Sequence, residues 1–249
     1  MARTKLVVGN WKMHGLAADL AQIQAIAAAA AAHPNVEVGL CLPATLIERA
    51  SIAVPGLPVG GQDVHFAREG AHTGCTSAPM LADAGASMVI VGHSERRDAQ
   101  RESDEEVRAK AIAGLDAGLL VILCVGESLA VRQSGDAVAT VGAQLDASLP
   151  RDIDVDRLAI AYEPVWAIGT GKTATVTDIA EMHAALRRRL VAAYGPAGET
   201  IRILYGGSVK PANAAEIFAV GDVDGALVGG ASLSAAQFIP IVEAAALKG

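Results

Sequence analysis

Eight short aliphatic runs recur along this 249-residue chain, and longer segments, several of them with helical periodicity, separate them. The runs span residues 5–10, 36–41, 59–62, 88–92, 119–124, 158–163, 201–205 and 225–228. Helical patterns between them include residues 16–32, 105–117, 178–193 and 212–220. Alternating strands and helices pair in parallel through right-handed crossovers, and nearly continuous apolarity is typical of parallel strands buried on both faces. The sequence therefore predicts an α/β fold, a single (β/α)8 barrel over residues 1–249.

An open, doubly wound sheet is the alternative arrangement of such units. The glycine-rich loop Gly-x-Gly-x-x-Gly, the main reason to prefer that fold, does not follow the first run. The closed barrel is therefore favoured.

Composition narrows the classes of function. Hydrophobic residues make up 52% of the chain and charged residues 19%, which suits a large core. No apolar run approaches the ~20 residues that span a membrane, and the net charge of −7 without a basic run argues against nucleic acid. The chain start lacks the apolar segment of a secretory signal, and three distant cysteines do not form a disulfide framework, so we expect a cytoplasmic protein. The sequence contains neither a Cys-x-x-Cys nor a His-x-x-x-His spacing, so we expect no metal site.

Polar and glycine residues gather where the predicted strands end. The active sites of such barrels lie at the carboxyl ends of the strands. The ends carry Asn10, Lys12, His93, Ser94, Glu95, Cys124, Glu127, Glu163, Gly206, Gly207, Ser208, Gly229 and Gly230. This concentration predicts an active site at that end of the barrel.

The sixth run ends at a lone carboxylate, Glu163, followed by Pro164. Proline removes a backbone donor and stops the strand, which leaves the carboxylate at its tip. The apolar residues that follow are closed by Gly169 and Gly171. This is the composition of a hinged lid over a carboxylate.

Two further strand ends offer a cation and an imidazole. Lys12 directly follows the first strand, so substrate binding is favoured over a solvated surface charge. His93 precedes a predicted helical turn that begins at Ser94, and a helix N-terminus disfavours the imidazolium, so we expect a neutral hydrogen-bond donor. Glu95 is either a second base or, as we favour, part of a buried ion pair that orients Lys12 or an arginine.

Paired glycines close the last two strands, as Gly206-Gly207-Ser208 and Gly229-Gly230. Glycine lets backbone N–H groups approach an anion closely, and barrel phosphate sites often form after strands seven and eight. The two pairs together predict a phosphate site. Cys124 ends an apolar strand with no histidine nearby in sequence, so a packed thiol is favoured over a nucleophile.

Five motifs resemble those of the triosephosphate isomerase family, in that family's order and spacing. They are residues 9–13 (GNWKM), 92–97 (GHSERR), 161–172 (AYEPVWAIGTGK), 205–210 (YGGSVK) and 225–233 (GALVGGASL). The resemblance implies interconversion of dihydroxyacetone phosphate and D-glyceraldehyde 3-phosphate through an enediolate, in glycolysis and gluconeogenesis, without a cofactor.

The resemblance also implies roles for individual residues, which are the family's well-known ones. Glu163 would be the base, neutral His93 would polarise the carbonyl, and Lys12 with Asn10 would stabilise the anionic enediolate. The phosphate would be bound by Gly169, Ser208, Gly229 and Gly230.

The family resemblance further implies a homodimer, in which Thr73 reaches the partner's active site. The chain departs from the family where subunits usually meet, at His14, His72, Cys75, Gln100 and Arg101. The dimer is therefore expected, with a re-packed interface.

Two other functions compete with this interpretation. Another phosphate-binding barrel enzyme, such as a lyase, often needs a strand-end lysine for a Schiff base, and no strand after the first ends in lysine. A non-catalytic scaffold on this fold should have lost the base or the phosphate glycines, and both are present.

Overall fold

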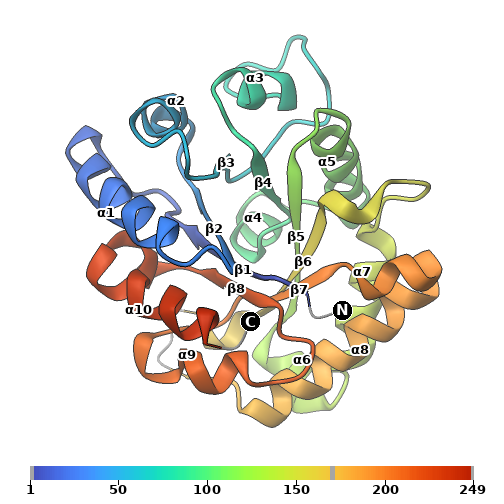
Figure 1. Cartoon of the computed structure of the whole chain (residues 1–249). Helices are drawn as coiled ribbons and strands as arrows, with labels where there is room; N and C mark the ends of the chain where they lie inside the picture. Colours follow the sequence, from blue (N-terminus) through green and yellow to red (C-terminus); the bar gives the residue numbers. More distant parts are fainter. Residues whose placement is uncertain (1–2, 169–171, 248–249) are drawn as a thin grey trace.

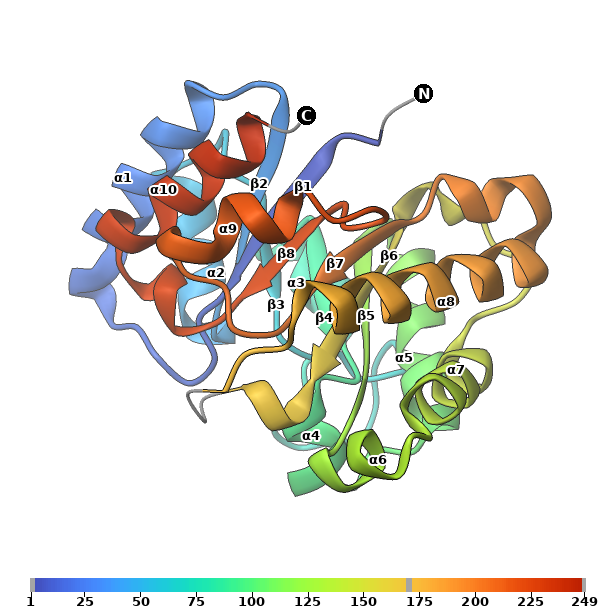
Figure 2. The ribbon, with the colours of Figure 1, turned by 90° about the horizontal axis from the view of Figure 1, so that it is seen from below.

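The computed structural model describes residues 3–168 and 172–247. Eight parallel strands close into a barrel in sequence order, β1 to β8, and helices surround it (Figures 1 and 2). The strands are β1 (Lys5–Asn10), β2 (Val36–Cys41), β3 (Val59–Gly61), β4 (Met88–Val91), β5 (Leu120–Glu127), β6 (Leu158–Pro164), β7 (Arg202–Tyr205) and β8 (Gly225–Val228). The predicted barrel is confirmed.

The helices follow the strands as expected, with extra short ones at both ends of the barrel. The α-helices are α1 (Leu20–Ala31), α2 (Ala44–Ala53), α3 (Ala78–Asp83), α4 (Ser94–Ala99), α5 (Asp104–Asp116), α6 (Leu129–Ser134), α7 (Ala137–Ser148), α8 (Val176–Tyr194), α9 (Pro211–Phe218) and α10 (Ala235–Ala246). Short 3-10 helices are η1 (Ala17–Asp19), η2 (Val155–Arg157), η3 (Val165–Ala167), η4 (Gly195–Glu199) and η5 (Gly230–Leu233). The first helix begins later than the pattern at 16–32 indicated, because η1 takes its first turn.

Two hydrophobic clusters explain why the strand sequences are almost continuously apolar. One face of the strands fills the barrel interior, with residues such as Val8, Ile122 and Leu204. The other face packs against the surrounding helices, with residues such as Val7 and Leu123. Each strand is therefore buried on both sides.

Strand β5 continues to Glu127, three residues beyond the end predicted at Cys124. The ladder with β6 persists through the pairs Gly126–Glu163 and Glu127–Pro164. A Cβ atom on Gly126 would lie 2.0 Å from the carbonyl oxygen of Glu163, so only glycine permits this approach. Gly126 thereby fixes the register that carries Glu163 to the rim.

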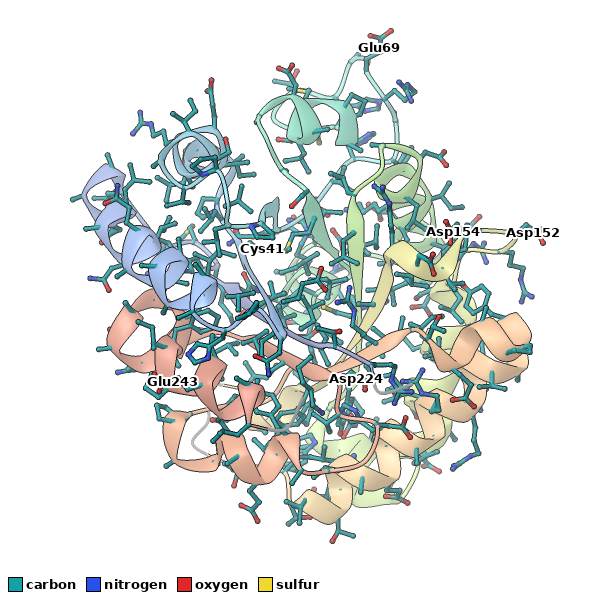
Figure 3. The ribbon with its side chains drawn as sticks, viewed as in Figure 1. Cys41, Glu69, Asp152, Asp154, Asp224 and Glu243 are labelled. Carbon is teal, nitrogen blue, oxygen red and sulfur yellow. The ribbon has the colours of Figure 1, made fainter. Side chains whose placement is uncertain are left out.

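Arg187, in α8, is a buried cation, whereas the next residue, Arg188, is exposed. The guanidinium of Arg187 contacts Asp222 at 3.0 Å and Asp224 at 2.9 Å. It also donates to the carbonyls of Gly198 and Ile201, both at 2.6 Å. Asp224, labelled in Figure 3, lies just before β8, so this network ties α8 to the amino ends of the last two strands.

Candidate active site

A cavity of about 720 Å³ opens at the carboxyl ends of the strands. The predicted site residues that line it are Asn10, Lys12, His93, Ser208, Gly229 and Gly230. They come from the ends of β1, β4, β7 and β8, so barrel closure brings together residues up to 220 positions apart in the chain. The site is where the strand-end rule places it.

Glu163 lies at the end of β6, and its side chain is only 1% exposed. One carboxylate oxygen accepts the Ser94 N–H at 2.9 Å, and the other accepts the Ser94 hydroxyl at 3.0 Å. The carboxylate is thus held at the N-terminus of α4, where backbone donors favour an anion. Glu163 does not itself line the cavity in this conformation.

His93 caps α4 and lies between that helix and Glu163. Its Nδ1 accepts the N–H of Glu95 at 3.3 Å, which assigns the ring proton to Nε2. Nε2 lies 3.1 Å from a carboxylate oxygen of Glu163. This geometry is compatible with an Nε2–H that points at the carboxylate, and the neutral state expected of the ring stays a prediction.

Lys12 adopts the left-handed region, with φ +53°, which is uncommon for a residue other than glycine. The side-chain oxygen of Asn10 accepts the Lys12 N–H at 3.0 Å and supports this turn. The ammonium group pairs with Glu95. Backbone strain of this kind is typical of functional sites, because the surrounding fold must hold it. The ion pair favoured for Glu95 is present, but its side chain is 54% exposed, so the expectation of a buried pair was wrong.

The opposite wall of the cavity presents backbone donors. Gly229 precedes η5, and its carbonyl accepts the N–H and the hydroxyl of Ser232. Within the described part of the chain, the N–H groups of Ser208 and Gly229 have no hydrogen-bond acceptor. Donors of this kind at a short helix N-terminus form an anion-binding concavity.

A polar network around η3 was not assigned by the sequence. One oxygen of Glu127 accepts hydrogen bonds from Tyr162, Trp166 and Arg132, each at 3.0 Å. Arg132 also donates to the Tyr162 hydroxyl at 2.8 Å. Trp166 belongs to η3, so this network ties η3 to β5 and β6. The strand-end position of Glu127 was visible in the sequence, but its partners were not.

Three sequence-predicted residues stand outside this arrangement. Gly169 lies outside the described residues. Thr73 is exposed on the loop after β3 and does not line the cavity of its own chain. Burial, with the Glu163 carboxylate nearby, raises the pKa of the Cys124 thiol well above its ordinary value, which favours a packed thiol over a nucleophile.

Neither metal-binding clusters nor membrane helices were found in the described part of the chain. Across residues 3–168 and 172–247, no three His, Cys, Asp or Glu side chains are placed to share a metal ion. In the same ranges, no helix combines the length and apolarity needed to cross a membrane.

Comparison with known proteins agrees with the motifs. A sequence model of the triosephosphate isomerase family matches residues 5–245. The chain is 56% identical over 245 residues to triosephosphate isomerase of Ruegeria pomeroyi, with 97% of each chain covered. It is 52% identical over 242 residues to that of Caulobacter vibrioides, with 96% of each covered. The crystal structure of triosephosphate isomerase from Bartonella henselae matches with a TM-score of 0.91 at 44% identity, over 97% of this chain and 98% of that one. The chain therefore belongs to the triosephosphate isomerase family.

Proposed function

We propose that Glu163 is the base with which this chain works as an isomerase of triose phosphates. The family membership makes the reaction the interconversion of dihydroxyacetone phosphate and D-glyceraldehyde 3-phosphate, a step of glycolysis. The observation that carries the residue assignment is the contact between the Glu163 carboxylate and Nε2 of His93 beside one cavity. A base and a hydrogen-bond donor this close face the adjacent carbon and oxygen atoms of a small substrate.

Glu163 removes a proton from the carbon next to the carbonyl, and the Nε2–H of His93 donates to the carbonyl oxygen on which negative charge develops. The same ring then moves the proton between the two oxygens of the enediolate. Lys12 stabilises the anion, and Asn10 holds the strained turn that presents it.

The phosphate group binds on the opposite wall. The N–H groups of Ser208, Gly229 and Gly230, together with the Ser208 hydroxyl, are the donors proposed here, and Gly169 joins them from the lid. The unpaired N–H groups of Ser208 and Gly229 within the described residues support this assignment.

Catalysis requires Glu163 to change partners. Both of its carboxylate oxygens accept from Ser94, and the side chain is buried and does not line the cavity. Closure of the lid, residues 164–172, moves the adjacent backbone, releases the carboxylate from Ser94 and excludes water.

A coupled assay of D-glyceraldehyde 3-phosphate conversion in deuterated water tests this proposal. The product is expected to carry deuterium on the carbon to which Glu163 delivers a proton, because the abstracted proton exchanges with solvent on the enzyme. A product that carries no deuterium would contradict removal of the proton to a base that exchanges it with solvent.

We also propose a C₂ homodimer. Met13, next to Lys12, is 95% exposed, and Leu16 and Met80 are also exposed apolar side chains. A cavity of about 390 Å³ is lined by Met13 together with Lys12 and Glu95. Thr73 of the partner subunit would occupy it and support the Asn10–Lys12 turn. Within the chain, the rings of His72 and His65 lie 3.9 Å apart between centroids and are tilted by 33°, which supports a re-packed divergent loop.

Light scattering at micromolar protein, with specific activity followed on dilution, tests the dimer. A dimer whose activity falls on dilution is expected, because a monomer leaves the Lys12 turn mobile. A fully active monomer would contradict it.

The domain organisation and the cellular location are also proposals. We propose that residues 1–249 form one domain, which is supported by a closed barrel whose strands begin at Lys5 and end at Val228. We propose a cytoplasmic location, which is supported by the free thiols of Cys41, Cys75 and Cys124. Limited proteolysis and cell fractionation are the respective tests.

A further inference from the structure

A second large cavity, of about 890 Å³, lies between α7 and the second half of α8. Its wall is completed by the loop that leads from α7 towards β6. Both helices run from the catalytic end of the barrel to the amino ends of the next strands, so their last turns lie at the opposite end from Glu163. Figure 1 shows α7 and α8 side by side, and Asp152 of the loop projects at the outer edge of the molecule in Figure 3. This cavity is therefore separate from the site described above.

The floor of the cavity is aliphatic. It is formed by Val138 and Leu149 from one side, Ile153 from the loop, and Ala185 and Ala192 from α8. The small alanine side chains of α8 leave the groove open. Such a surface binds the apolar body of a ligand.

The rim of the cavity carries three guanidinium groups. The charge of Arg189 is already paired, because its guanidinium contacts Asp146 and lies against Gly142 of α7. Arg151 and Arg188 are exposed and make no hydrogen bond or ion pair within residues 3–168 and 172–247. Asp152 lines the cavity as well, so a net positive charge of about one remains after pairing. In a protein of net charge −7, this is a local site of opposite sign.

Tyr194 holds the cavity in shape. Its hydroxyl donates to the carbonyl of Pro150 at 2.6 Å, which ties the end of α8 to the loop. Burial raises the pKa of Tyr194 to about 12, although Arg151 opposes the shift, so the phenol is neutral at physiological pH. The aromatic ring therefore adds a rigid, uncharged wall beside the free guanidinium of Arg151.

We propose that this cavity binds an organic anion with an apolar body, of the class of aryl or alkyl phosphates and sulfonates. The anionic group contacts Arg151 and Arg188, which bind such oxyanions through paired N–H donors. The apolar body lies on the aliphatic floor against Tyr194. The inference is independent of the isomerase reaction.

A fluorescence titration with anilinonaphthalene sulfonate tests the proposal. The catalytic cavity is first saturated with glycerol 3-phosphate, so that its phosphate donors are occupied. The double variant Arg151→Ala/Arg188→Ala is compared with Arg49→Ala, which removes an exposed arginine from α2 far from the cavity. We expect at least a tenfold rise in the Kd of the probe for the double variant and no change for Arg49→Ala.

A second variant probes the floor rather than the rim. Ala192→Glu keeps a residue with high helix propensity but places a carboxylate in the groove, so probe binding should be lost while the melting temperature is retained. Inorganic phosphate, which lacks an apolar body, should bind at least tenfold more weakly than the probe. Wild-type affinity for the probe in either variant, or no measurable binding to the wild-type protein, would overturn the proposal.

Discussion

Shortening Glu163 by one methylene tests the catalytic assignment most sharply. Glu163→Asp keeps the charge and the strand end but withdraws the carboxylate by about 1.5 Å, the length of one carbon–carbon bond. In the structure the carboxylate lies 3.1 Å from Nε2 of His93 and 2.9 Å from the N–H of Ser94. A withdrawal of that size takes the base out of reach of the substrate carbon from which it removes the proton.

The magnitude follows from the geometry. A misplacement of ~1 Å costs roughly a hundredfold in rate, which is about 2.7 kcal/mol of barrier at 1.36 kcal/mol per factor of ten. We expect kcat to fall by at least this factor. KM should change little, because the proposed phosphate donors Ser208 and Gly229 come from other strand ends.

Steady-state kinetics in both directions, with thermal melts to confirm folding, provide the measurement. Glu48→Asp is a matched control, because it makes the same chemical change on the exposed surface of α2. Near-normal turnover in Glu163→Asp would refute the assignment. A loss expressed wholly in KM would place Glu163 in substrate binding instead.

Three further predictions follow from particular residues. Gly230→Val should weaken binding of glycerol 3-phosphate by tenfold or more without unfolding the chain, because a Cβ at this position meets no atom within 4 Å but projects among the proposed phosphate donors; unchanged affinity measured by calorimetry would place the phosphate elsewhere. Arg101→Gly should raise the free energy of unfolding by about 0.5–1 kcal/mol and Tm by about 2 °C, because φ is +57° and relief of left-handed strain outweighs the entropy of glycine. The same change at Arg49, inside α2, should lower stability by about 1 kcal/mol, and equal effects at both positions in a scanning calorimeter would contradict this reasoning. Burial lowers the pKa of His183 to about 4, so below an unfolded-state pKa of about 6.5 the unfolded chain binds more protons and stability falls as pH drops from 6.5 to 4, by up to about 3 kcal/mol. His183→Gln should flatten that part of the stability–pH curve in urea titrations, and an unchanged slope would show that other groups set it.

The sequence alone determined the barrel and the end of it that carries the site. Hydrophobic periodicity is a property of neighbouring residues. The eight aliphatic runs and the helices between them could therefore be recognised without knowledge of distant contacts. Strand-end positions then placed Lys12, His93, Glu163 and Gly229 at one rim, because parallel strands in a barrel all end on the same side.

Only the tertiary structure decided how these side chains are oriented and paired. Glu163 accepts from Ser94, a contact across 69 positions that no local pattern contains, and does not line the cavity. Arg187 is buried and pairs with Asp222 and Asp224, because the fold brings these two carboxylates against that face of α8. Backbone strain at Lys12 and Arg101 was equally invisible, since the backbone dihedral angles of a loop are set by the elements at its two ends rather than by its own residues. Periodicity fixes which elements form, whereas orientation, burial and charge pairing depend on residues that meet only when the barrel closes.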